Sequence, residues 1–264
     1  LGIPSGPYQK EWDEYRSIVT GAIPDAPAMF FDLPGNHAAY NDRNFAYYLA
    51  NSIQGRATGQ KQLSWTRQFG FGAYHFLGVN TCDNTGAGFS LFWPYGDNAG
   101  LDAAELTFIN DELAAHSTAD LTFVFGHHPI AATGSSEDTY LLYGYNEFAS
   151  ALAGFGASGY GYGHTHATSE ALFDGDSRTG NMPGDGVCYL NLASLGKSSS
   201  NQLSVIAVDC NGLSVATQSV KTWPIVLITA PVARTIGSST NPYAYTVPNA
   251  ATNPIRALVF DPAT

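Results

Sequence analysis

Three observations predict an α/β layered domain followed by a short β module. Segments with helical periodicity alternate with short apolar runs between residues 9 and 166. Histidines follow several of these runs, at the positions where α/β sheets collect ligands. Prolines become frequent after Trp223. Alternating helices and buried strands are typical of layered α/β folds, whereas closely spaced prolines disfavour helices and suit turns and strand edges.

The helices are predicted from apolar residues that recur at intervals of three and four. This spacing holds over residues 9–19, 101–113 and 146–155. At the start of the second segment, Asp102 and Glu105 have the spacing of a capping box, in which two side chains satisfy free N–H groups at the beginning of a helix. We therefore expect three helices that each bury one face.

The strands are predicted from short apolar runs that end at glycine, proline or polar residues. These runs are residues 28–31, 69–79 (one or two strands), 121–125, 187–192 and 203–209. We interpret the last two as strands of a meander joined by the turn at 196–201. The runs at 28–31 and 121–125 are predicted to be buried, and each delivers a histidine-bearing loop at its carboxyl end.

The end of the chain differs in composition from the rest. In residues 223–264 prolines separate short β-like runs such as 225–229 and 257–260. We therefore interpret residues 1–222 as one domain and residues 223–264 as the start of a small β-sandwich module that ends early.

The composition excludes several classes of protein. Lys plus Arg is 11 and Asp plus Glu is 22, which gives a formal net charge of −11. This excess of anions argues against a nucleic-acid binder, whose affinity comes from cations that neutralise phosphates. Hydrophobic residues make up 44% of the chain, too many for a disordered tail. Because the sequence has no run of about 20 apolar residues, it predicts no transmembrane segment.

The three cysteines lack the paired spacing of a zinc ribbon. Cys188 and Cys210 lie in apolar, strand-like runs, so they could form a disulfide across a sheet and leave Cys82 free. Three buried thiols are the alternative, and the spacing does not decide between the two.

Five of the seven histidines occur in three short turns. The turns are Asn36-His37, His127-His128 and His164-Thr165-His166. The first two follow predicted strands, and the third follows the glycine-rich residues 159–163. Since the carboxyl ends of strands collect ligands in α/β sheets, imidazoles and an amide oxygen could meet at one edge. Imidazole suits zinc, iron, nickel and copper, so the sequence predicts a metal site there.

The remaining histidines receive a different interpretation. A single buried histidine is more often a hydrogen-bonded core residue than a ligand, and we interpret His75 and His116 in this way. We place His128 at the rim of the predicted site or directly behind its ligands.

Three motifs resemble the last three motifs of the calcineurin-like metallophosphoesterase family. They are Gly35-Asn36-His37, Gly126-His127-His128-Pro129 and Gly163-His164-Thr165-His166. Their order and separations also fit the family, and the resemblance covers roughly residues 9–222. It implies a four-layer α/β/β/α sandwich that holds two metal ions bridged by a hydroxide.

The motif match also implies roles for individual residues. Asn36, His127 and His164 would hold one ion, and His166 would contribute to the other. His37 would be the general acid beside the leaving group. The ions would be divalent or trivalent Zn, Mn or Fe. Residues 223–264 resemble the trailing immunoglobulin-like domain of some family members.

The sequence departs from the family in two places. The opening motifs Asp-x-His and Gly-Asp-x-x-Asp, which supply most ligands of the first ion and the bridging carboxylate, do not occur in it. Residues 1–20 resemble the segment that follows these motifs, so we expect a missing segment upstream. With that segment the centre would hold two ions, and without it one or none. Ala38 replaces the acidic residue that usually orients the histidine of Gly-Asn-His.

These features predict a metal-dependent phosphoester hydrolase, a phosphatase or a phosphodiesterase, as the activity of the full-length protein. A metal-bound hydroxide would attack phosphorus and His37 would act as the acid. A non-catalytic descendant that binds a partner at a cell surface is the alternative, because the carboxylates are missing. A metal-dependent hydrolase of a non-phosphorus ester is a third hypothesis.

Substrate and location are predicted only in outline. The acidic surface favours a small phosphoester over a nucleic acid. Residues 38–68 and the aromatic loop at 89–95 are expected to line the approach, with His128, Trp93 and Tyr95 as predicted substrate-binding residues. Packing over a core edge is the alternative for the aromatic rings. Few lysines and a β module suggest an extracytoplasmic or secreted protein.

Overall fold

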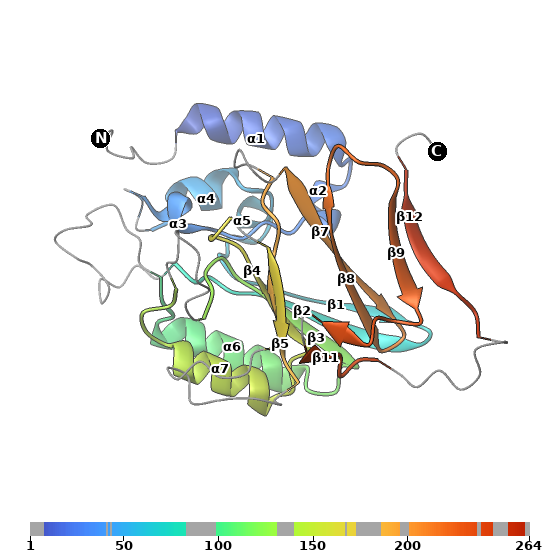
Figure 1. Cartoon of the computed structure of the whole chain (residues 1–264). Coiled ribbons are helices and arrows are strands. Elements are labelled where there is room, and N and C mark those ends of the chain that lie inside the picture. The colour runs from blue at the N-terminus through green and yellow to red at the C-terminus, as the bar shows by residue number, and fades with distance from the viewer. Residues whose placement is uncertain are drawn as a thin grey trace.

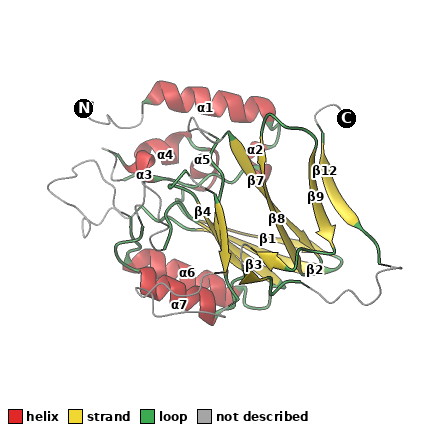
Figure 2. Ribbon diagram, in the orientation of Figure 1, coloured by secondary structure: helices red, strands yellow, loops and turns green. Residues whose placement is uncertain are grey.

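The computed structural model shows a mixed α/β fold in which strands lie between two groups of helices (Figure 1). Figure 2 shows α1–α5 on one side of the strands and α6 and α7 on the other. The structure describes residues 8–40, 42, 44–82, 99–130, 140–166, 168–172, 186–195, 201–236, 239–244 and 253–261.

Six strands form one mixed sheet in the order β1-β2-β3-β4-β6-β5. They are β1 (Leu63–Phe69), β2 (Gly72–Gly78), β3 (Leu121–Phe125), β4 (Gly159–Tyr162), β5 (Ser169–Leu172) and β6 (Cys188–Asn191). Strands β2, β3, β4 and β6 run parallel, and β1 and β5 pair antiparallel at the two edges. The strands predicted within 69–79, 121–125 and 187–192 are confirmed. The glycine-rich residues also form a strand, so the third histidine turn follows a strand as well.

Helices α6 (Ala103–Ala115) and α7 (Tyr145–Gly154) cover one face of this sheet (Figure 1). Their buried side chains and alternate residues of the strands form one hydrophobic cluster. It includes Ile109, Leu113, Phe148 and Leu152 from the helices and Leu77, Val124 and Tyr160 from the strands. Both helices agree with the predicted helical segments. Their buried faces pack on the strands, including β3 and β4, from which two of the histidine loops start.

The predicted capping box at the start of α6 forms only in part. The Asp102 carboxylate accepts the N–H of Glu105 at 2.7 Å, as expected. The Glu105 carboxylate does not return to the helix end. It accepts the backbone N–H of Asn80 at 2.8 Å and the side-chain amide of Gln62 at 2.7 Å. Tertiary contacts therefore outcompete the local bond for this side chain.

The hairpin of β7 (Gln202–Asp209) and β8 (Gly212–Ser219) packs on the opposite face of the sheet. The predicted strand at 203–209 is confirmed, but its pairing with residues 187–192 in a meander is wrong. Strand β6 has β4 and β5 as neighbours on its two edges, so it has no edge left for β7. Most of the turn predicted at 196–201 lies outside the described residues.

The first helix is confirmed, since α1 spans Gln9–Ala22. The strand predicted at 28–31 is wrong. Residues Ala26–Met29 form the short helix α2, and the chain then runs irregularly to Gly35 without pairing to any strand among the described residues. Side chains, and not a neighbouring strand, form hydrogen bonds with the backbone of this segment. The Gln54 amide donates to the carbonyl oxygen of Phe30 at 2.7 Å, and the Tyr48 hydroxyl donates to the carbonyl oxygen of Asp32 at 2.9 Å.

Three further short helices complete this side of the molecule: α3 (Asn36–Ala39), α4 (Ala46–Asn51) and α5 (Ile53–Thr58). The Asp32 carboxylate accepts the N–H groups of Ile53 and Gln54, at 2.7 and 2.8 Å, and so holds the start of α5. The irregular segment therefore still places Asn36 and His37 at its end.

The last strands form two antiparallel pairs. They are β9 (Ile225–Ala230) with β12 (Arg256–Phe260), and β10 (Thr235–Ile236) with β11 (Ser239–Thr240). Arg256 binds the Asp209 carboxylate at 2.7 and 2.8 Å, and the Tyr243 hydroxyl donates to the carbonyl oxygen of Gly186 at 2.8 Å. The boundary at residue 222, the four-layer arrangement and the immunoglobulin-like module stay predictions.

The three cysteines are free thiols, so the predicted disulfide between Cys188 and Cys210 is wrong. Cys188 is buried within β6, whereas Cys210 is exposed in the turn between β7 and β8. The alternative of three buried thiols holds for Cys82 and Cys188 only. Among the described residues, none of the helices has the length and apolar character needed to cross a membrane.

Candidate metal centre

Three loops bring the predicted metal-binding side chains to one edge of the six-stranded sheet. Asn36 follows the irregular segment after α2, His127 follows β3 and His164 follows β4. Strands β3 and β4 are parallel neighbours, so the loops at their carboxyl ends lie side by side. The N–H of Gly163 donates to the carbonyl oxygen of His127 at 3.1 Å and joins these two loops.

The side chains of Asn36, His127 and His164, here called the loop cluster, converge. His127 Nε2 lies 3.0 Å from Asn36 Oδ1 and 3.1 Å from His164 Nδ1. These contacts join residues 91 and 37 positions apart in the sequence. The predicted convergence of distant side chains is confirmed, and their roles as metal ligands stay predictions.

His127 is a neutral imidazole near pH 7. Burial is the main cause, and the nearby histidines His164, His37 and His166 add to it, so that the pKa of His127 falls to about 3. A neutral imidazole does not repel a cation and can offer a nitrogen lone pair. The same interactions show that His37 and His166 lie near His127.

His128 lies behind the loop cluster. Its side chain is completely buried, and its ring centroid is 4.6 Å from that of His164. Its Nδ1 lies 3.1 Å from both the hydroxyl and the carbonyl oxygen of Thr81. Among the residues that the structure describes, its Nε2 has no hydrogen-bond partner. Burial, with smaller contributions from His127 and His164, holds the pKa of His128 well below its ordinary value.

Complete burial leaves His128 no surface for a substrate, so the predicted substrate contact by this residue is not supported. The structure groups it instead with His127 and His164, since the potential ligand atoms of the three lie within 4.8 Å of one another. His166 is not part of that group, and its predicted contribution to a second ion stays a prediction.

The backbone around the loop cluster lets the side chains and loops of the cluster lie close to one another. A methyl group at Gly35 would lie 2.9 Å from two ring atoms of His127, so the ring can lie against this loop only because position 35 is glycine. His164 and His166 have φ values of 65° and 54°, a region that residues other than glycine seldom occupy. Thr165 between them exchanges hydrogen bonds of 3.0 and 2.7 Å with Asn191, which holds the turn.

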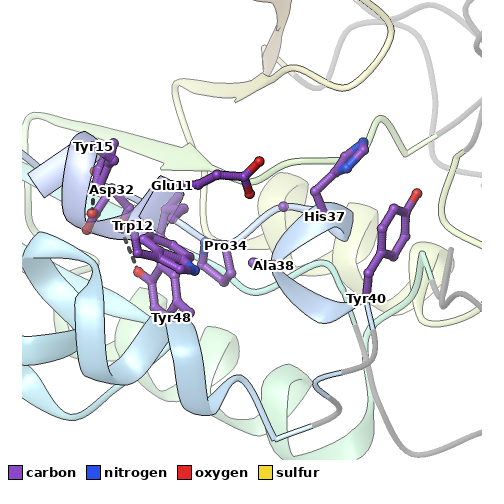
Figure 3. Close-up of a pocket in the computed structure, with 11 residues that line it drawn as sticks. Glu11, Trp12, Tyr15, Asp32, Pro34, His37, Ala38, Tyr40 and Tyr48 are labelled. Carbon is purple, nitrogen blue, oxygen red and sulfur yellow. Dashed lines mark hydrogen bonds between the residues drawn. The ribbon is translucent and has the colours of Figure 1, made fainter. Parts of the chain in front are cut away.

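His37 lies at a cavity of about 560 Å³ (Figure 3). The ring of His37 packs at a tilt against Tyr40, with 4.6 Å between centroids. Tyr40 also receives a hydrogen bond of 3.0 Å from the Asn36 amide, so it connects the two neighbouring side chains. Trp12 and Glu11 of α1 line the same cavity. The cavity therefore presents aromatic rings and a carboxylate beside the histidine.

Two predicted substrate-binding residues, Trp93 and Tyr95, lie outside the described residues together with the whole loop at 89–95. Within the predicted approach at 38–68, Ala38, Tyr40 and Tyr48 line the cavity.

Sequence reasoning missed Thr81, and it included Tyr40 only as part of the approach at 38–68. The Thr81 hydroxyl accepts the N–H groups of both His127 and His128 at 3.1 Å, so it holds the histidine loop in place. Thr81 follows β2 just as His127 follows β3, and a polar residue behind a predicted strand was the available signal.

The loop cluster fits a transition-metal ion. Ligand atoms on one ion with bonds of about 2.0–2.1 Å lie roughly 3.0–3.4 Å apart, and the distances of 3.0 and 3.1 Å agree with this. Two imidazoles and an amide oxygen form a donor set that suits Zn²⁺, Mn²⁺ or iron.

Comparisons with known proteins agree in part with these observations. The sequence matches no protein-family model and no curated protein. Several solved structures resemble the fold. A dimetal phosphatase from Danio rerio has 11% identity and a TM-score of 0.47, with 87% of this chain and 71% of that chain covered. A purple acid phosphatase from yellow lupin (Lupinus luteus) seeds has 11% identity and a TM-score of 0.37, with 59% and 30% covered.

The structural neighbours include two phosphatases. Another structural neighbour is GAP50, the anchor in the inner membrane complex of Plasmodium. It has 15% identity and a TM-score of 0.41, with 60% of this chain covered. The chain spans 49% of GAP50 and 30% of the lupin enzyme. All three TM-scores are below 0.5.

Proposed function

We propose that this chain carries part of the active site of a metal-dependent phosphoester hydrolase. The convergence of Asn36 Oδ1, His127 Nε2 and His164 Nδ1 within 3.0–3.1 Å supports the proposal most directly. These three side chains come from the motifs Gly-Asn-His, Gly-His-His and Gly-His-x-His, each of which ends a separate segment of the fold.

The donor set favours an anionic substrate. Neither the Asn36 amide nor an imidazole carries a negative charge, so the donors of the loop cluster do not neutralise a cation that they hold. The full charge remains available for the oxygens of a phosphoryl group. When bound, Zn, Mn or Fe would polarise such an oxygen and lower the pKa of a water molecule toward neutral.

The other residues position and protonate the substrate. His37 faces the cavity, where it would act as the general acid that gives a proton to an alkoxide leaving group. Tyr40 packs against His37 and binds Asn36, so it fixes the two side chains relative to each other. The carboxylate that usually follows this histidine is absent at Ala38. We therefore expect a preference for small esters with good leaving groups.

The finer assignments rest on the sequence alone, the first three on the family resemblance and the location on the few lysines and the β module. They are the four-layer domain at 1–222, the immunoglobulin-like module at 223–264, a second ion held in part by His166, and an extracytoplasmic or secreted location.

A second function is favoured by a specific observation. The sequence contains neither Asp-x-His nor Gly-Asp-x-x-Asp, which supply the anionic ligands in the family it resembles. A protein that keeps the scaffold and one weakly held ion would bind a partner without hydrolysis.

The test combines metal content with turnover. The purified full-length protein, with the segment upstream of this chain, is loaded with Zn²⁺ or Mn²⁺. Bound metal is counted before hydrolysis of p-nitrophenyl phosphate, bis(p-nitrophenyl) phosphate and p-nitrophenyl acetate is measured. We expect bound metal and phosphoester turnover in the wild type. His164→Ala and Asn36→Ala should lose turnover and the metal equivalent held by the loop cluster, whereas Asn110→Ala, on the exposed face of α6, should keep both.

Absence of a bound ion in the wild type would refute the hydrolase. Bound metal without turnover of any ester would favour the binding protein. Turnover of the acetate alone would favour the non-phosphorus ester hydrolase.

A further inference from the structure

A second histidine group lies outside the loop cluster. His75 on β2, Glu112 on α6 and His116 at the end of α6 offer potential ligand atoms within 4.8 Å of one another. We call these three residues the helix cluster. Because its members come from a central strand and from the helix that covers it, the cluster lies between two layers of the fold.

His75 points toward the helix layer. Successive side chains of a strand alternate between its faces, and Leu77, two residues later, belongs to the hydrophobic cluster under α6 and α7. The side chain of His75 is completely buried. Its Nε2 lies 3.1 Å from the Ser64 hydroxyl, which occupies that nitrogen. Its Nδ1 is buried and has no hydrogen-bond partner within the described part of the chain.

An unpartnered buried nitrogen is uncommon, because burial without a hydrogen bond is costly. The sequence-based interpretation of His75 as an ordinary hydrogen-bonded core residue is therefore only half correct. The ring of His116 lies beside it, with 4.2 Å between ring centroids and 34° between ring planes. One nitrogen of His75 is satisfied, and the other remains available to a ligand between the layers.

Glu112 and His116 supply the other donors from one helix face. They are four residues apart, so successive turns of α6 place them one above the other. His116 Nε2 lies 3.6 Å from Glu112 Oε2. Ligand atoms on one zinc ion lie roughly 3.3 Å apart, so this pair needs only a small movement. Both side chains are about one third exposed, at 34% and 30%, which gives an ion a path to the site.

The charges in the helix cluster favour a cation. Burial, the main cause, lowers the pKa of His75 to about 4, so its imidazole is neutral near pH 7. Glu112 adds a negative charge. The end of the 13-residue helix α6 adds the negative end of the helix dipole, since His116 is its C-cap residue. The loop cluster has no carboxylate among its three donors.

We propose that His75, Glu112 and His116 form a zinc-type metal site that fastens the end of α6 to the central sheet. Two imidazoles and one carboxylate are a common protein ligand set for zinc, with water as the fourth ligand. Binding there would stabilise the folded state, because the unfolded chain does not hold the three donors together.

ZnCl₂ binding to the metal-free wild-type chain tests the proposal, with calorimetry, metal counting and thermal unfolding as measurements. Glu112→Gln and His116→Ala are suitable variants, because both side chains are partly exposed and their replacement leaves the core intact. Asp111→Asn is the matched control, since it also removes one negative charge from α6 but at an exposed position outside the cluster.

We expect His116→Ala to bind one equivalent of zinc fewer than the wild type, or to bind that equivalent more than about tenfold more weakly. Glu112→Gln should also weaken it, and Asp111→Asn should not. Zinc should raise the unfolding temperature of the wild type more than that of His116→Ala.

The variant His164→Ala separates this site from the proposed catalytic centre. It should keep the zinc equivalent that His116→Ala loses, whether or not the chain hydrolyses phosphoesters. Equal zinc stoichiometry and affinity in the wild type and His116→Ala would overturn the proposal. An equivalent that disappears in His164→Ala but persists in His116→Ala would assign all binding to the loop cluster and also overturn it.

Discussion

The loop cluster and the helix cluster bring nitrogen and oxygen donors together in different ways. In the loop cluster, contacts of 3.0 and 3.1 Å join residues 91 and 37 positions apart. In the helix cluster, Glu112 and His116 are neighbours on one helix, and only His75 comes from a distant segment. The loop cluster depends on tertiary contacts for its geometry, whereas the helix supplies most of the geometry of the second.

This difference explains the unusual supports around the loop cluster. The Thr81 hydroxyl holds two N–H groups, Gly35 leaves space for the His127 ring, and His164 has a left-handed backbone. The helix cluster needs no comparable features, since the hydrogen bonds of α6 set the spacing of its two residues. The comparison teaches that loops hold a donor set only when specific contacts fix them.

The largest expected effect comes from Gly35→Ala. The added methyl group would lie 2.9 Å from the His127 ring, so the ring must move away from Asn36 and His164. We expect metal affinity of the loop cluster to fall by about 100-fold or more, since displacement of a ligand exceeds the loss of an outer contact. Zinc binding by the helix cluster should not change.

Gly21→Ala is the matched control for this prediction, because a methyl group at Gly21 in α1 has no atom within 4 Å. Titration of each variant with Zn²⁺ or Mn²⁺ gives the affinities. Unchanged binding at the loop cluster in Gly35→Ala would show that the position of the His127 ring does not limit it.

A smaller effect is expected from Thr81→Val, which removes the hydroxyl but keeps the shape of the side chain. The N–H groups of His127 and His128 then lose their acceptor inside the protein. Leaving two buried donors unsatisfied should lower the free energy of unfolding by about 2–4 kcal/mol. Urea denaturation at pH 7 measures the change as a lower midpoint at constant slope.

Ser214→Ala is the control here, since the buried Ser214 hydroxyl has no hydrogen-bond partner and its removal should change the stability little. An equal loss in the two variants would mean that volume, and not the two hydrogen bonds, determines the effect.

The smallest effect concerns a second carboxylate on α6. Burial raises the pKa of Glu105 to about 7, against the opposing hydrogen bond from Asn80 and that from Gln62. The folded state then binds more protons than the unfolded state between about pH 4.5 and pH 7. Relative to Glu105→Gln, the wild type should therefore lose about 2–3 kcal/mol of stability as the pH rises through this range.

Unfolding by urea at pH 5 and pH 8 measures this difference. Glu147→Gln, at an exposed position in the first turn of α7, should follow the wild type. If Glu105→Gln also followed it, the carboxyl would be ionised in the folded state at pH 5. Glu105 would then be charged throughout this pH range.

The sequence predicted the elements whose burial pattern is local. The helices at α1, α6 and α7 and the strand β3 follow from apolar spacing, because one buried face imposes that spacing on the residues themselves. Residues 28–31, which end α2 and begin the irregular segment after it, were predicted as a strand because they are apolar. Whether such a run joins a sheet depends on a neighbouring strand, and here Gln54 and Tyr48 occupy its carbonyl groups instead.

The same limit applies to the sites. The motifs around Asn36, His127 and His164 indicated the loop cluster, since histidines behind strands have a recognisable position in the chain. The helix cluster has no such motif. His75 lies within a strand and 41 positions before His116, so neither residue indicates the other.

The sequence by itself determined that helices alternate with strands, that the chain is acidic, and which residues form the loop cluster. Periodicity, composition and motif order decide these features, and all three are properties of the chain. Tertiary structure decided how far His127 lies from its neighbours, why His128 is buried, and that His75 meets Glu112 and His116. These features depend on which face of a strand lies under which helix, and this is settled only when the layers pack.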